Sequence, residues 1–117
     1  MREQIRDIER LQHIRESIVT LLQGRDNYSL DDLRQQRILF HGFVKEVEII
    51  GEAVYKLTHE FRDTHSEVPW ADIEHMRHVL VHGYYQISPE KLWATVMSDL
   101  DVLLPFIERY IKELEGQ

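Results

Sequence analysis

Hydrophobic residues recur every three or four positions along most of the chain, which is the spacing of one face of an α-helix. Charged residues fill the positions between them in the first segment, where the apolar stripe consists of Ile5, Ile8, Leu11, Ile14, Ile18 and Leu21. The pattern predicts an amphipathic helix over residues 2–23. Gly24 is expected to end it, because glycine commonly follows the last turn of a helix.

A second stripe predicts one long helix over residues 30–62. Ser29 precedes it and Asp32 lies three positions later, as in a capping box, and acidic side chains favour the positive end of the helix dipole. The apolar positions of this segment are Leu33, Phe40, Val44, Val47, Ile50, Val54, Leu57 and Phe61. The sequence T-H-S-E-V-P at residues 64–69 is expected to end the helix.

Two more helices are predicted in the C-terminal half of the chain. Pro69 suits the first turn of a third, shorter helix, and Gly83 is expected to end that helix. The apolar positions of the third helix are Trp70, Ile73, Met76 and either Val79 or Leu80. Ser88–Glu90 combines an N-cap serine, a proline and an acid, so a fourth helix should start there and continue to Leu114. Pro105 lies inside this fourth helix and is expected to bend it.

Strand signals are nearly absent from the sequence. No segment alternates apolar and polar residues over more than a few positions, and no Asn-Gly or Asp-Gly pair joins two apolar runs. We therefore expect an all-α protein, and four amphipathic helices joined by short links favour an antiparallel up-down four-helix bundle. At 117 residues the chain has the usual length of one domain, so a single domain over residues 1–117 is expected.

The composition narrows the class of protein further. Hydrophobic residues make up 43% and charged residues 30% of the chain, which is typical of a folded globular protein. There is no cysteine, which excludes disulfide bonds and thiolate zinc sites. The charged N-terminal segment lacks the apolar run of a signal peptide, and no stretch approaches the roughly 18 apolar residues of a membrane span. We therefore expect a cytoplasmic protein with no membrane attachment.

The net charge of −7 limits how the chain could bind a nucleic acid. Non-specific affinity for nucleic acids comes mainly from the neutralisation of phosphates by lysine and arginine. A broad nucleic-acid-binding surface is therefore not expected on so acidic a protein. Any chemistry on a nucleic acid would have to come from a local basic site.

The segment R-H-V-L-V-H-G-Y at residues 77–84 places an arginine, two histidines and a tyrosine in an otherwise apolar run. Arg77 and His82 are five positions apart, or roughly 140° around an ideal helix, so one regular helix would not bring them together. Arg77 and Tyr84 would share one face, and His78 and His82 another. Two arrangements remain: a distorted helix end at Gly83, or two copies of the helix paired across a two-fold axis.

The same segment also allows a metal interpretation. His75, His78 and His82 are spaced so that imidazoles one turn apart could ligate zinc. The H-E-x-x-H pattern of many zinc enzymes is incomplete, however, because Val79 stands where the glutamate would be. No metal and no other cofactor is therefore expected.

Three landmarks together resemble a known family. Arg77, five positions before His82, followed by Gly83-Tyr84, matches the Arg-x4-His signature of the HEPN superfamily with the H-x-Y ending of HepT-like toxins. I-I-G-E-A at residues 49–53 and V-P-W at residues 68–70 occur in the expected order before it. The chain therefore resembles HepT-like toxins over nearly its whole length. At Lys45-Glu46 it departs from the Arg-Asn of that family's pattern.

The resemblance implies a HEPN-like homodimer in which two Arg-His motifs meet and form a metal-independent endoribonuclease. It also implies that the chain is the toxin partner of a small MNT-type nucleotidyltransferase antitoxin, which would silence it by transferring AMP to Tyr84. Arg77 and His82 would be the catalytic residues, with His78 and Tyr84 in support, and RNA would be the substrate. The alternative is a non-catalytic HEPN module that serves as a scaffold for a nucleotidyltransferase.

Each candidate also has a purely structural interpretation. Arg77 could belong to an ordinary ion pair, for instance with Glu74. Gly51-Glu52, in the middle of the predicted second helix, could be a notch for close helix packing, or its carboxylate could anchor the motif arginine. Trp70 and Trp93 fall on apolar stripes, so they are expected in the core rather than on a base-stacking surface.

Overall fold

The computed structural model describes residues 2–83 and 87–117, and these residues form helices and connecting turns without any β-strand. The helices are α1 (Arg2–Asn27), α2 (Leu30–Gln35), α3 (Arg37–Lys56), α4 (His59–Thr64), α5 (Trp70–His82) and α6 (Pro89–Glu115). The prediction of an all-α fold is confirmed.

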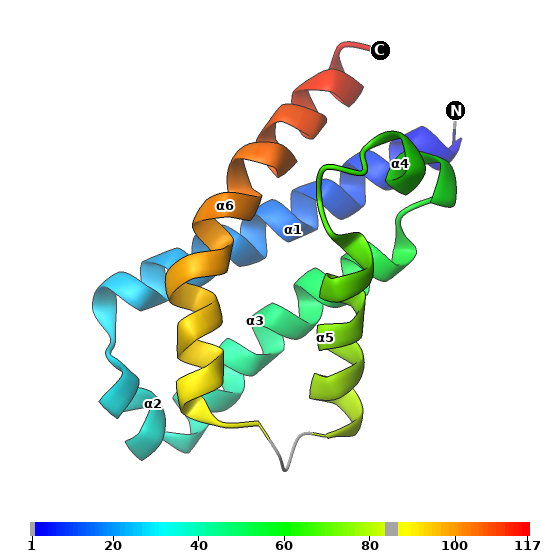
Figure 1. Cartoon of the computed structure of the whole chain (residues 1–117). Helices are drawn as coiled ribbons and strands as arrows, with labels where there is room; N and C mark the ends of the chain where they lie inside the picture. The colour runs from blue at the N-terminus through cyan, green and yellow to red at the C-terminus, as the bar shows by residue number, and fades with distance from the viewer. Residues whose placement is uncertain (1, 84–86) are drawn as a thin grey trace.

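The long helices pack as an antiparallel bundle built around α1 and α3 (Figure 1). α1 and α3 run side by side in opposite directions, α6 crosses α1, and α5 packs along α3. The short helix α2 closes one end of the bundle by contacting α3 and α6. This arrangement leaves α5 held mainly by one neighbour, so much of its circumference faces outwards.

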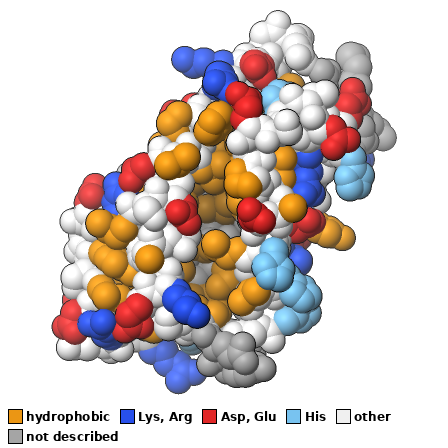
Figure 2. Space-filling model, in the orientation of Figure 1, with side chains coloured by type: hydrophobic (Ala, Val, Ile, Leu, Met, Phe, Trp, Pro, Cys, Tyr) orange, Lys and Arg blue, Asp and Glu red, His pale blue; other side chains and the backbone are white. Residues whose placement is uncertain are grey.

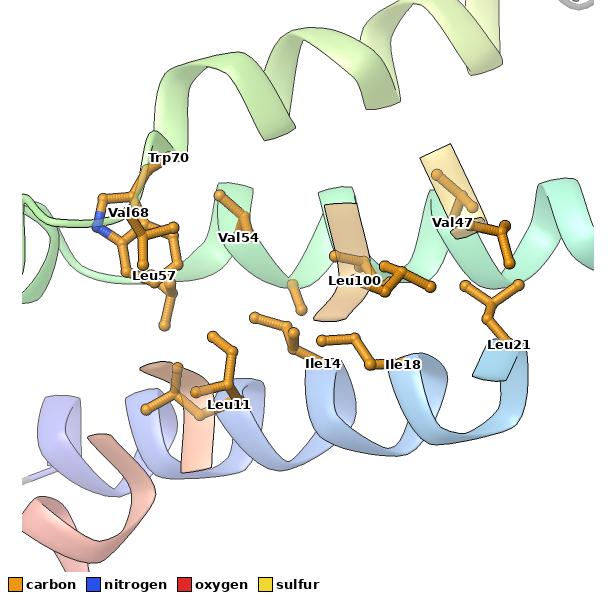
Figure 3. Packing of buried hydrophobic residues seen from close by; sticks show 14 of the residues in the cluster. Leu11, Ile14, Ile18, Leu21, Val47, Val54, Leu57, Val68, Trp70 and Leu100 are labelled. Atoms are coloured by element: carbon orange, nitrogen blue, oxygen red, sulfur yellow. The ribbon is translucent and has the colours of Figure 1, made fainter. Parts of the chain in front are cut away.

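The core lies between the facing stripes of α1, α3 and α6 (Figure 3). Ile14 and Ile18 of α1 are fully buried and point towards Val47 and Val54 of α3, while Leu100 of α6 fills the layer beside them. Full burial of an aliphatic side chain of this size stabilises a fold by roughly 1.5–3 kcal/mol. The stripes predicted from the sequence are therefore the ones that form the core.

The predicted helix over residues 30–62 is wrong, because the chain breaks twice within it. Gln36 is extended between α2 and α3 without a side-chain cap. The second break, before α4, has a visible cause: Thr58 caps α4 by accepting a hydrogen bond from the N–H of Phe61 at 3.1 Å. The buried carboxylate of Asp7 accepts hydrogen bonds from both the N–H and the hydroxyl of Thr58, at 2.9 and 2.7 Å. A residue of α1 thus fixes the break.

The expected end of α1 at Gly24 is also wrong, since the helix continues to Asn27. Gly24 packs against the ring of Phe43 on α3, and a Cβ atom at position 24 would lie 2.7 Å from Cζ of that ring. The glycine therefore makes room for an aromatic side chain instead of ending a helix.

The other helix boundaries follow the local signals in the sequence. Ser29 and Asp32 form the predicted capping box, with bonds of 2.9 and 3.1 Å. Ser88 caps α6 by accepting from the N–H of Lys91 at 3.1 Å. α5 ends at Gly83, as expected. α6 continues without interruption past Pro105.

α1 and α6 have 26 and 27 residues, long enough in length alone for a bilayer. Both carry charged residues throughout their exposed faces. Among the helices of residues 2–83 and 87–117, none is both long and apolar enough to cross a membrane.

Candidate active site

The contact between α3 and α5 is closest where Gly51 meets Arg77. A Cβ atom at position 51 would lie 2.3 Å from Cβ of Arg77 and 3.2 Å from its Cα, which is closer than any real side chain could be. The I-G-E-A segment therefore holds a glycine because α5 passes over it at that point. This close packing fixes the base of the arginine side chain against α3.

The guanidinium of Arg77 lies between two side chains of α3. Its Nε atom is 2.6 Å from a carboxylate oxygen of Glu52, although the N–H does not point along a hydrogen-bond direction, so the contact is mainly electrostatic. Its Cζ atom lies 5.4 Å from the centre of the Tyr55 ring, within range of a cation–π interaction. Glu52 also approaches Lys56 at 3.4 Å. These contacts hold the Nε side of the guanidinium, and no described side chain forms a hydrogen bond with the Nη nitrogens of Arg77, which makes them candidates for binding an anion.

The motif histidines lie on a different face of α5, where they point outwards. The rings of His78 and His82 have centres 4.6 Å apart, and His75 lies 6.4 Å from His78. All three are exposed, and Val79, which shares their face, has 42% of its surface exposed. Figure 2 shows the histidines gathered over α5, beside a hydrophobic hollow between α5 and α6. We call the face formed by His75, His78, Val79 and His82 the α5 outer stripe.

A single protomer does not bring Arg77 and His82 together. α5 is regular up to His82, and the N–H of Gly83 donates to the carbonyl of Val79 at 2.7 Å, as in an ordinary helix turn. Arg77 therefore faces α3, whereas His82 faces outwards roughly 140° further round the helix. The distorted helix end considered from the sequence is not observed within the described residues. Within one protomer, His78 lies next to His82, and Arg77 is paired with Glu52.

The structure distinguishes between the two ion-pair partners considered for Arg77. Of these two, Glu74 pairs with Arg62 at 3.5 Å, and Glu52 is the one that contacts Arg77. Over residues 2–83 and 87–117, no three histidine or carboxylate side chains are grouped as a metal-ligand set, and the histidines of α5 do not form one. Tyr84 lies outside the described residues.

The tryptophans occupy the positions expected of core residues. Trp70 has only 5% of its surface exposed, and its indole N–H donates to the carbonyl of His65 at 2.9 Å. Trp93 packs against the core beside Phe43. Trp70 is therefore unavailable as a stacking surface for bases, and Trp93 is partly covered by the core.

Tyr55 is a candidate site residue that the sequence did not reveal. It lies one turn beyond Glu52, has 57% of its surface exposed, and stacks its ring against Arg77. An exposed aromatic residue one turn after the I-G-E-A segment was the available signal. It became meaningful only when the position of α5 was known.

A polar cluster around the buried Tyr110 joins α6 to the turn before α5, away from the motif. The Tyr110 hydroxyl donates to the carboxylate of Glu67 at 2.8 Å, and Arg109 binds the same carboxylate at 2.8 Å. Burial and the hydrogen bond to Glu67 raise the pKa of Tyr110 to about 12. The bonds from Tyr110 and Arg109 lower the pKa of Glu67. This cluster stabilises the connection that precedes α5.

The sequence also matches a known protein family. The family model described as "Ribonuclease HepT-like" matches residues 1–110. The chain belongs to the HepT-like ribonuclease family. In this family member, the motif arginine and the I-G-E-A glutamate form one ion pair, and the motif histidines lie on the opposite, exposed face of α5.

Several named proteins resemble this HepT-like chain along most of their length. "Putative RNase TTE0752" of Caldanaerobacter subterraneus subsp. tengcongensis is 36% identical over 104 residues, which cover 89% of each chain. "Probable ribonuclease HepT" of Thermococcus cleftensis is 28% identical over 102 residues, covering 87% of this chain and 93% of that protein. "Putative RNase MJ0127" of Methanocaldococcus jannaschii is 27% identical over 107 residues, covering 92% and 88%. No solved structure gives a significant match.

Proposed function

We propose that this chain is the toxin of a HEPN/MNT toxin–antitoxin pair and acts as a metal-independent endoribonuclease. The observation that supports this most is the position of Arg77, held against α3 by Gly51, Glu52 and Tyr55, with its Nη nitrogens left for an anion. A guanidinium fixed in this way suits bidentate binding of a phosphate. The family membership and the names of the relatives agree with activity on RNA.

The active form in this proposal is a homodimer, because one protomer leaves Arg77 and His82 on different faces of α5. The α5 outer stripe supports this choice, since an exposed valine lies among its histidines. Pairing two outer stripes across a two-fold axis would cover that valine in both copies. The proposal further requires that the dimer bring His82 of one protomer towards the Arg77 of its partner, so that each phosphate meets both groups.

The proposed reaction transfers a phosphoryl group of the RNA backbone from the 5′-oxygen of one nucleotide to the 2′-oxygen of the preceding nucleotide. The 2′-oxygen forms a bond to the adjacent phosphorus while the bond to the 5′-oxygen breaks, which gives a 2′,3′-cyclic phosphate and a 5′-hydroxyl. His82 of one protomer takes the proton of the 2′-hydroxyl, and its counterpart gives a proton to the leaving 5′-oxygen, since imidazole titrates near neutral pH. Arg77 stabilises the charge that develops on the phosphate oxygens. His78, with its ring 4.6 Å from that of His82, assists in orienting it.

Regulation in this proposal depends on Tyr84. The MNT-type partner forms a bond between the tyrosine oxygen and the α-phosphorus of a nucleoside triphosphate, and pyrophosphate leaves. The added nucleotide is bulky and negatively charged, so it would exclude an RNA phosphate from the cleft. Intact-mass measurement after co-expression with the antitoxin should show the mass of added AMP, and this addition should be lost in Tyr84→Phe.

A cleavage assay in EDTA tests the catalytic proposal. Wild-type protein should cleave single-stranded RNA without a metal, and Arg77→Ala and His82→Ala should each lose most of this activity. Glu108→Ala, at an exposed position of α6 outside the motif, is the matched control and should cleave like wild type. Activity that disappears in EDTA, or that survives both substitutions, would refute the proposal.

A non-catalytic scaffold is the second candidate, because Glu52 already neutralises Arg77 and the chain is strongly acidic. A scaffold would bind the nucleotidyltransferase without cleaving RNA. The same assay separates the two: the scaffold predicts no activity above that of Arg77→Ala, together with a stable complex in co-purification.

A further inference from the structure

A second hollow lies between α1 and α3. Its volume is about 360 Å³. Most of its lining is charged, and the charged or titratable residues are Arg10, His13, Lys45, Glu48, Glu52 and Lys56. We call it the α1–α3 hollow. No step of the proposed cleavage uses it.

The α1–α3 hollow carries surplus positive charge on an acidic protein. Each of its carboxylates is already paired: Glu48 lies 3.6 Å from Lys45, and Glu52 lies 2.6 Å from Arg77 and 3.4 Å from Lys56. Among the described side chains, none forms such a pair with Arg10. The guanidinium of Arg10 therefore remains as an uncompensated cation, beside two lysines whose ammonium groups are exposed.

Arg10 is also incompletely hydrogen-bonded. Its Nε atom is buried, and no acceptor lies within hydrogen-bonding geometry of it in the described part of the chain. A buried donor without an acceptor typically costs about 1–3 kcal/mol, and more on a charged group. Such a group is unusual in a folded protein unless something outside the protein satisfies it.

The hollow adjoins the candidate active site through one shared residue. Glu52 lines the hollow and at the same time contacts Arg77, so the hollow extends to the carboxylate that holds the motif arginine. A strand of RNA presents a phosphate at every nucleotide. A phosphate held at Arg77 would therefore have neighbours within reach of the hollow.

We propose that the α1–α3 hollow binds a backbone phosphate of the RNA substrate next to the one that is cleaved, with Arg10 as its main ligand and Lys45 and Lys56 at its rim. This inference depends on the proposed function for the identity of the substrate. It assigns to Arg10 a role in binding RNA and none in the cleavage step. It also explains how so acidic a chain could hold a polyanion.

The test uses a short single-stranded RNA with 2′-O-methyl riboses, which lacks the 2′-hydroxyl and cannot be cleaved. Its dissociation constant is measured at several salt concentrations for wild type, Arg10→Gln, Lys56→Gln and the control Arg34→Gln. Each phosphate contact contributes roughly 0.7–1 to the slope of log affinity against log salt. Arg10→Gln should weaken binding several-fold and reduce the slope by about one such contact. Lys56→Gln should show a smaller change in the same direction.

Arg34 is a suitable control because it is exposed and lies on α2, where it pairs with Glu90 at 2.8 Å. Arg34→Gln should leave both affinity and slope at the wild-type values. The melting temperature of Arg10→Gln should equal or exceed that of wild type, because the substitution removes an unsatisfied charged group. A lower melting temperature with unchanged RNA binding would show a purely structural role and overturn the inference.

The two proposals fail in different ways. If Arg10→Gln and Lys56→Gln bind RNA like wild type, while Arg77→Ala has lost cleavage, the phosphate site is refuted and the nuclease stands. If wild type neither binds nor cleaves RNA, both proposals are refuted.

Discussion

Gly51 and Arg77 are in direct contact across the α3–α5 interface, with no room for a Cβ atom on the glycine. This contact has two consequences. It lets α5 approach α3 closely, because only the base of the Arg77 side chain lies between the two helices at this point. It also places the guanidinium of Arg77 next to Glu52, which follows Gly51 in the chain. A packing feature thus positions a candidate catalytic group.

Gly51→Ala should therefore destabilise the protein and impair cleavage. The added methyl group would have to displace the base of the Arg77 side chain, and overpacking of this kind typically costs about 1–3 kcal/mol. Gly42→Ala is the matched control, because it lies in the same helix with no atom within 4 Å of the added Cβ. That substitution should stabilise the protein by roughly 0.5–1 kcal/mol through helix propensity. Chemical denaturation measures both; equal effects at the two positions would contradict the account.

Glu52→Gln should reduce cleavage more than it reduces stability. The carboxylate positions Arg77, and its loss should lower kcat at least tenfold, which corresponds to about 1.4 kcal/mol. An ion pair of this exposure contributes only about 0–1 kcal/mol to folding. Asp101→Asn removes a comparable pair with Arg25 and should leave kcat unchanged. A Glu52→Gln enzyme with wild-type kcat would show that Arg77 needs no positioning partner.

Val79→Glu should prevent formation of the proposed dimer and abolish cleavage. The substitution places a charge in the middle of the α5 outer stripe, and a buried unpaired charge at an interface costs several kcal/mol. Val102→Glu serves as control, since Val102 is an exposed valine of α6 with 66% of its surface accessible. Sedimentation equilibrium gives the oligomeric state. A dimeric and active Val79→Glu protein would place the interface elsewhere.

Tyr110 should make the stability depend on pH in the alkaline range. Its pKa is raised from 10.0 to about 12 in the folded protein, so folding favours the protonated hydroxyl. The resulting stabilisation is fully present below pH 10.0 and is lost as the pH rises towards about 12. The stability difference between wild type and Tyr110→Phe should therefore shrink over this range. Urea denaturation at increasing pH measures it, and a constant difference would contradict the shifted pKa.

Local signals in the sequence were sufficient for most helix boundaries. Ser29 and Ser88 cap the helices that they were expected to cap, because such bonds involve residues only three positions apart. The break at Thr58 could not be predicted in this way. Its capping depends on Asp7, which is 51 positions away in the chain. The role of Gly24 likewise depends on Phe43 of another helix.

The candidate site likewise has features that the local sequence predicts and features that depend on contacts between helices. The Arg-x4-His spacing indicated both motif residues, and helix geometry alone predicted that Arg77 and His82 would point in different directions. The partner of Arg77 could not be chosen between Glu74 and Glu52 from spacing, because the choice depends on which helix lies against α5. Tyr55 could not be predicted as a site residue for the same reason, since its contact with Arg77 joins two different helices.

The central claim is that Arg77 of one protomer and His82 of the other act on the same phosphate. Wild-type protein is mixed with increasing amounts of the double variant Arg77→Ala/His82→Ala, unfolded and refolded together, and assayed for RNA cleavage in EDTA. In a mixed dimer, the intact Arg77 and His82 belong to the same wild-type chain and lie on different faces of its α5. Neither shared site would then contain both groups, so the mixed dimer should be inactive. Activity per wild-type chain should therefore fall in proportion to the fraction of wild-type chains. Activity per wild-type chain that stays constant at every ratio would contradict the shared site.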